Sequence, residues 1–278
     1  MSYYYLISGL PNLSLDQITE NVPAQPIDVD EILDTIQRNL EPSDEQLFRY
    51  LIYPHDNHNL LNILFAKHSD LVQSTFITPA LLSQQDLLDY HKHKGSFPSY
   101  MSAFLDAYED QFSSISPSEM ENKLLDFFYE DVGQKGPFIA EYYRFERSLK
   151  GLFSAYNHSY FDFLAAPVDD EVALMHQVGQ GKSIPSDLLR DYPYIEEIAQ
   201  VISTHQPAAI EMLMDRIKWD YLDEVRSFFS GEQVFAYTLR LLMVHRWQTM
   251  NAEKGAARFQ ELQEGIKNKV RSLKTPVI

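Results

Sequence analysis

The feature that most constrains the fold is an apolar helix signature that recurs about every ninety residues. Its leading leucines are Leu60, Leu149 and Leu239, at intervals of 89 and 90 residues. Each begins a Leu-x-x-(Ile/Leu)-(apolar) segment, whose i, i+3, i+4 spacing places three apolar side chains on one helix face. A helical unit repeated at a fixed interval is typical of repeat architectures, which usually form binding surfaces. The alternative is coincidence, because Leu-x-x-Leu is common in helical proteins.

The helix pattern extends along the whole chain and predicts an all-α fold. No series of short β-branched runs alternates with turn residues, as a β-protein would require. Residues 1–26 are interrupted by glycine and proline and form a lead-in. With the repeat, this organisation predicts three similar helical modules, arranged as a funnel or socket, over residues 27–112, 113–206 and 207–278.

Local signals predict where individual helices begin and end. Asp28 or Asp30 caps a helix that runs to about Leu40. Pro54 is expected to end the following helix, since proline disfavours helical geometry in the residue before it. Thr78 as N-cap and Pro79 at the first helical position predict another helix start. Later helices are expected over 118–133, 137–164, 194–203, 208–229, 232–250 and 256–273.

The charge distribution excludes some classes of partner. The net charge of −17 argues against nucleic-acid binding and against adsorption to an anionic membrane surface. Residues 1–135 contain 21 acidic and 7 basic residues, whereas residues 251–278 contain 3 acidic and 6 basic ones. This asymmetry can orient the protein against a basic partner. The alternative is an acidic surface that only keeps the chain soluble.

Targeting signals and cysteine chemistry are missing from the sequence. The chain has no cysteine, which excludes disulfides, thiolate metal sites and cysteine nucleophiles. The segment from Met1 to Ile7 lacks the basic region of a signal peptide. No stretch approaches the roughly 18 apolar residues that span a bilayer. We therefore expect a soluble, cytoplasmic protein without direct membrane insertion.

Three fragments match part of a known phosphate-binding or metal-binding motif. Gly179–Ser183 ends like a phosphate-binding loop, but His176 occupies the position of the first glycine, and a linker is the preferred interpretation. Two histidine clusters, His55/His58 and His91/His93, lack an evident third metal ligand. No Gly-x-Ser-x-Gly elbow is present. We expect no catalytic residue, no cofactor and no metal. The alternative is a nucleotide-binding enzyme that uses Lys182 of the Gly179–Ser183 loop.

Polar residues accompany the repeated leucines and are candidates for a partner interface. Their functional interpretation is that helices of the three modules line a common concave surface. The alternative is a solvated helix face whose ion pairs contribute only about 0.2–0.5 kcal/mol each. The candidates near the leucines are Asp56, Asn59, Arg144, Glu146, Arg147, Arg240 and Arg246.

Several of these segments resemble the C-subunit family of the V/A-type ATPases, whose eukaryotic vacuolar counterpart is the d-subunit. The resemblance rests on Asp56-x-x-Asn59-Leu60-x-x-Ile63-Leu64 followed by Phe76–Pro79, and on Glu232–Tyr237, which adds Tyr237 to the interface candidates. Tyr3–Leu13 and Tyr143–Leu149 are similar to a bacterial group encoded beside V/A-type ATPase subunits. The resemblance also leads us to expect a Glu-x-Arg pattern after the third apolar segment, which begins at Leu239. The chain has Trp247 and Gln248 there instead.

The resemblance implies a non-catalytic central-stalk subunit that couples the rotor shaft to the membrane rotor ring. Its partners would be rotor-stalk and rotor-ring subunits, and the ring would associate it indirectly with the inner membrane. An acidic socket suits a basic shaft tip. The competing hypothesis is a free-standing α-helical adaptor that binds another protein.

Overall fold

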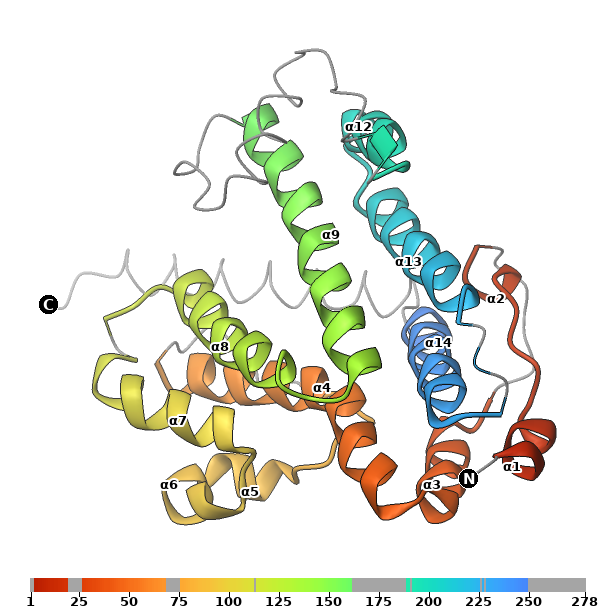
Figure 1. Cartoon of the computed structure of the whole chain (residues 1–278). Coiled ribbons are helices and arrows are strands. Elements are labelled where there is room, and N and C mark those ends of the chain that lie inside the picture. The colour runs from red at the N-terminus through yellow and green to blue at the C-terminus, as the bar shows by residue number, and fades with distance from the viewer. Residues whose placement is uncertain are drawn as a thin grey trace, which may run out of the picture.

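The computed structural model describes residues 3–19, 27–68, 76–112, 114–161, 189–190, 192–225, 227 and 229–249. Within these residues every regular element is a helix, which confirms the all-α prediction (Figure 1). The α-helices are α1 Tyr4–Gly9, α2 Asp16–Thr19, α3 Val29–Asn39, α4 Pro42–His68, α5 Gln84–Leu88, α6 Tyr90–His93, α7 Ser99–Tyr108, α8 Pro117–Val132, α9 Pro137–Phe161, α12 Ile195–Ser203, α13 Pro207–Asp223 and α14 Gly231–Thr249. Two short 3₁₀ helices are η1 Lys94–Ser96 and η2 Glu109–Gln111.

Several predicted helix starts are confirmed, with the expected capping chemistry. The Asp28 carboxylate accepts a hydrogen bond from the Glu31 N–H at 3.0 Å, as an N-cap of α3 should. Helix α13 is shorter than predicted, because it ends at Asp223 instead of reaching Phe229. The predicted helix over 256–273 lies outside the described residues.

The prediction that Pro54 ends a helix is wrong, since Pro54 lies inside the continuous helix α4. Figure 1 shows that this helix changes direction along its length, as helices with an internal proline do. Proline has no N–H, so the carbonyl of Tyr50 four residues earlier loses its helical donor. The Tyr143 hydroxyl of α9 donates to that carbonyl instead, at 2.6 Å. Tertiary packing therefore tolerates the proline.

The predicted helix start at Thr78 and Pro79 is also wrong. The Thr78–Pro79 peptide bond is cis, and residues 76–83 are not helical. The next helix, α5, begins at Gln84 with Ser83 as its N-cap. The local capping pattern was misleading because the backbone of this segment bonds to α4 instead of to itself.

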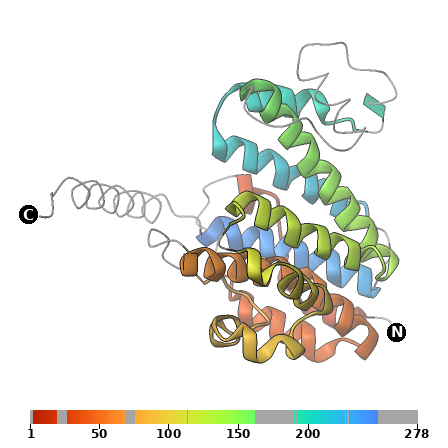
Figure 2. The ribbon, with the colours of Figure 1, turned by 90° about the vertical axis from the view of Figure 1, so that its left-hand side faces the viewer.

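Two hydrophobic cores hold the helices together. The main core joins α3, α4, α7 and α8 to the first half of α9, the end of α13 and α14. A second, smaller core joins the second half of α9 to α12 and the first half of α13. Figures 1 and 2 both show α12 above the layer that contains α4, α8 and α14.

The repeated leucines are buried in these cores. Leu60 and Leu239 belong to the main core and Leu149 to the second. The three modules and the funnel arrangement stay predictions. Among the described residues, no helix combines the length and the apolar character needed to cross a bilayer.

Candidate functional site

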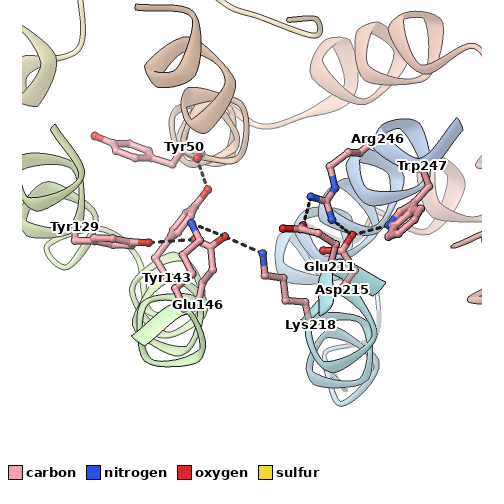
Figure 3. Close-up of polar contacts among 10 residues, drawn as sticks. Tyr50, Tyr129, Tyr143, Glu146, Glu211, Asp215, Lys218, Arg246 and Trp247 are labelled. Atoms are coloured by element: carbon pink, nitrogen blue, oxygen red, sulfur yellow. Dashed lines mark hydrogen bonds and ion pairs between the residues drawn. The ribbon is translucent and has the colours of Figure 1, made fainter. Parts of the chain in front are cut away.

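A charged contact joins α9 and α13 at the level where both helices pass from one core to the other. On α9, Tyr143 belongs to the main core and Leu149 to the second core, and Glu146 lies between them. On α13, Lys218 lies between Ile217 of the second core and Trp219 of the main core. The Lys218 ammonium contacts the Glu146 carboxylate at 3.1 Å (Figure 3). We call this level the seam.

The Glu146 carboxylate has three polar neighbours at the seam. Besides Lys218, the Lys150 ammonium approaches it at 3.3 Å, and the Tyr129 hydroxyl donates to its second oxygen at 3.4 Å. The Glu146 side chain is only 13% exposed. Burial by itself raises the pKa of Glu146, but the two ammonium groups outweigh it and lower the pKa to about 2. Glu146 is therefore ionised at neutral pH.

A second charged cluster joins α13 to α14, and its α13 residues share the helix face that carries Lys218. Asp215 is buried, yet its carboxylate forms an ion pair with Arg246 and accepts the Trp247 indole N–H at 2.8 Å. Arg246 also contacts Glu211 at 2.7 Å. Burial opposes the charge of Arg246, but Asp215 and Glu211 raise the pKa of its guanidinium above the ordinary value. Figure 3 shows Glu211, Asp215 and Lys218 extending from α13, with Glu146 of α9 on one side of them and Arg246 and Trp247 of α14 on the other.

The side chains of Asp56 and Asn59 form hydrogen bonds with the backbone of the segment that follows α4. Asp56 accepts the N–H groups of Leu81 and Leu82, both at 3.1 Å. Asn59 accepts the Ile77 N–H at 2.7 Å and donates its amide to the Ile77 carbonyl at 2.9 Å. Both side chains are buried. We call these bonds the α4 clamp.

Burial dominates the electrostatics of the α4 clamp. It raises the pKa of Asp56 to about 6, although the N–H groups of Leu82 and Leu81 favour the carboxylate. No ion pair neutralises Asp56 among the residues that the structure describes. The neighbouring His55 ring bonds to the Pro79 carbonyl at 2.8 Å, and burial lowers its pKa.

The other interface candidates contact different neighbours. Arg147 extends over the Tyr129 ring and contacts Asp126 at 3.3 Å. Arg240 pairs with Asp223 at 2.5 Å and lies over the Trp219 ring. The Tyr237 hydroxyl donates to the Pro11 carbonyl at 3.0 Å, and burial raises its pKa to about 12. Arg144 is exposed on α9. Their roles toward a partner stay predictions.

Sequence reasoning missed Asp215 and Lys218 as partners of the predicted residues Arg246 and Glu146. A signal was present, because Glu211, Asp215 and Lys218 follow an i, i+4, i+7 spacing on one helix. Charged residues at helical spacing within an apolar stretch point to neighbouring helices that supply opposite charges.

These arrangements can fix the relative positions of helices. The carboxylates of Glu146 and Asp215 each have a cationic side chain beside them. In the described part of the chain, no group of three or more His, Asp or Glu side chains is arranged to hold a metal ion. The Gly179–Ser183 loop and Lys182 lie outside the described residues.

Comparison with known proteins assigns a family without assigning an activity. No curated protein and no solved structure matches the chain. A family model described as "Protein of unknown function (DUF2764)" matches residues 1–270, which is nearly the full length. The chain therefore belongs to the DUF2764 family.

Proposed function

We propose that this protein is a non-catalytic central-stalk subunit of a V/A-type rotary ATPase, in which it couples the rotor shaft to the membrane rotor ring. The α4 clamp is the observation that carries the proposal. The resemblance to the C-subunit family rests on the Asp56-x-x-Asn59 element and on the segment beginning at Phe76. Side chains of the first bond to the backbone that follows in the second. The resemblance thus concerns one folded unit instead of two separate short motifs.

The ties between helices support a mechanical role. A part that transmits torque must resist sliding of one helix along another. The Tyr143–Tyr50 bond connects α9 to α4, and the Glu146–Lys218 pair connects α9 to α13. The Asp215–Arg246 pair connects α13 to α14. Directional bonds of this kind oppose displacement that apolar contacts alone would permit.

The charge of the chain supports the proposed partners. A net charge of −17 favours encounter with a basic shaft tip and guides its approach. In this proposal the protein lies on the cytoplasmic side and reaches the inner membrane only through the rotor ring.

A free-standing α-helical adaptor is the second candidate. An open groove between α9 and α13, lined in part by Phe145 and Tyr221, favours it. Such a groove can bind a protein segment without any motor.

Purification of the tagged protein from its native cells under mild detergent conditions tests the proposal. We expect mass spectrometry to identify rotor-stalk and rotor-ring subunits of a V/A-type ATPase. The tag alone, expressed at the same level, should recover none of them. Recovery of the folded, tagged protein without these subunits, in cells that contain the ATPase, would overturn the motor proposal and favour the adaptor.

A further inference from the structure

An open groove runs between α9 and α13 on the surface beside the seam. Two hollows of about 480 and 270 Å³ share Tyr221 and Glu224 in their linings and therefore lie side by side along it. On α9 the wall consists of Phe138, Glu141 and Phe145, at i, i+3 and i+7. At a rise of about 1.5 Å per residue this wall spans about two helical turns. Figure 1 shows α13 below α12 and α9 beside both of them.

The apolar part of the groove lining is aromatic. The rings of Phe145 and Tyr221 stack with centroids 4.0 Å apart and an interplanar angle of 7°. Both side chains are partly exposed, as is Phe138 farther along the groove. Stacked, partly exposed rings offer an apolar surface for large side chains and negatively polarised faces for cations.

The rim of the groove is acidic. Glu141, Asp220 and Glu224 are exposed, and among the described residues none of these three forms an ion pair. Arg216 is the basic side chain of the larger hollow, and it already pairs with Glu197. Burial raises the pKa of Asp220 against the effect of Arg216, and the nearby Glu197 and Glu224 add to the rise. A cation bound here would relieve this repulsion.

Other segments of this chain fit the groove poorly. Residues 162–188 contain five acidic residues and one basic residue, so the acidic rim repels them. Residues 251–278 are basic, but they follow Thr249 at the far end of α14. Glu232, in the first turn of that helix, lines the groove, and Thr249 lies about 25 Å farther along the helix axis. The acidic rim therefore favours a basic occupant. Residues 251–278 begin far from the groove, so we assign the groove to another protein and include this segment in the test.

We propose that the groove between α9 and α13 binds a cationic amphipathic helix of a partner protein. Apolar side chains at i, i+3 or i+4, and i+7 would lie on Phe138, Phe145 and Tyr221, as in other helix-in-groove complexes. Flanking Lys or Arg side chains would contact Glu141, Asp220 and Glu224. The inference goes beyond the proposed function, because the groove selects a helix by charge and shape whether or not the partner belongs to a rotary ATPase.

Fluorescence anisotropy with the full chain tests this inference. The probe is a labelled helical peptide of about five turns with a leucine stripe flanked by lysines, and its matched control carries glutamates in place of the lysines. We expect only the basic peptide to bind. The double variant Asp220→Asn/Glu224→Gln should weaken binding about fivefold at low salt, because each exposed charge contributes about 0.2–1 kcal/mol. This difference should shrink in about 0.5 M salt.

A charge-matched variant separates the groove from the general acidity of the protein. Glu121 and Glu130 are exposed on α8, so Glu121→Gln/Glu130→Gln removes the same charge elsewhere and should leave the affinity unchanged. Equal weakening by both double variants would overturn the inference, as would equal binding of the two peptides.

Two further results would assign the groove to a different occupant. Tighter binding of a peptide of residues 251–278 than of the designed basic helix would assign it to this chain's own tail. A self-association that sedimentation detects in the wild type but not in the groove variant would assign it to a second copy. Neither result affects the native purification that tests the motor proposal.

Discussion

The main core and the seam satisfy their buried polar groups in different ways. In the main core, the partners are backbone groups and neutral side chains: Tyr143 bonds to the Tyr50 carbonyl, and Asp56 bonds to backbone N–H groups. At the seam and beside it, Glu146 and Asp215 pair with full positive charges. Bonds to backbone fix the path of the chain within one unit. Ion pairs between helices fix how two units meet, and acid weakens the contribution of Glu146, whereas rising pH weakens that of Asp56.

The largest effect on stability should come from substitution of Asp215, which lies beside the seam. Asp215→Ala leaves Arg246 with only Glu211 and deprives the Trp247 indole of its acceptor. Asp215 is buried, but Arg246 is 41% exposed and keeps Glu211, so we expect a loss of about 2–3 kcal/mol in the free energy of unfolding. Urea denaturation followed by circular dichroism measures it. Glu121→Gln, on the surface of α8, is the control and should change stability by less than about 0.5 kcal/mol.

The seam should also be sensitive to acid. The pKa of Glu146 in the folded protein, about 2, lies below its ordinary value of 4.5, so its contribution is present above pH 4.5 and is lost as the pH falls toward 2. We expect Glu146→Gln to lower the free energy of unfolding by about 2 kcal/mol at pH 7 and by progressively less toward pH 2. Denaturation at several pH values tests this. A cost that is independent of pH would show that the pair contributes packing alone.

Asp56 should respond to pH in the opposite direction. Its folded pKa of about 6 lies above the ordinary 3.8, so the stability that it contributes is present below pH 3.8 and is lost as the pH rises through 6. Between pH 4 and 6 the free energy of unfolding of the wild type should fall by about 2 kcal/mol through the titration of Asp56. The Asp56→Asn variant should not show this fall. The same titration of both proteins measures the difference. Parallel pH profiles would contradict the assignment.

The smallest effect should come from the uncharged hydrogen bond between Tyr143 and Tyr50 in the main core. Tyr143→Phe leaves the Tyr50 carbonyl without a donor and should cost about 1 kcal/mol, with little dependence on pH. A double-mutant cycle with Pro54→Ala sharpens this test, because alanine restores an N–H that can bond to the same carbonyl. Tyr143→Phe should then cost less than it does beside Pro54. An unchanged cost would mean that the hydroxyl does not compensate for the proline.

The comparison also explains where sequence reasoning succeeded. Asp28 caps α3 as predicted, because an N-cap depends on residues three positions apart. Thr78 and Pro79 carried an equally good local signal, yet α5 begins later, at Gln84. There the bonds from α4 to the segment 77–82 override the local preference. Glu146 and Arg246 were identified as notable charges, but their partners Lys218 and Asp215 were not, because those contacts span 72 and 31 residues.

The sequence by itself determined the helical class, most helix positions and the burial of Leu60, Leu149 and Leu239, because helical periodicity is local information. Only the tertiary structure decided that α4 continues through Pro54 and that α9 and α13 pass between two cores. The same holds for the charged residues that meet at the seam. These features depend on which distant helix supplies a donor, a counter-charge or an apolar face, and no spacing along the chain encodes that choice.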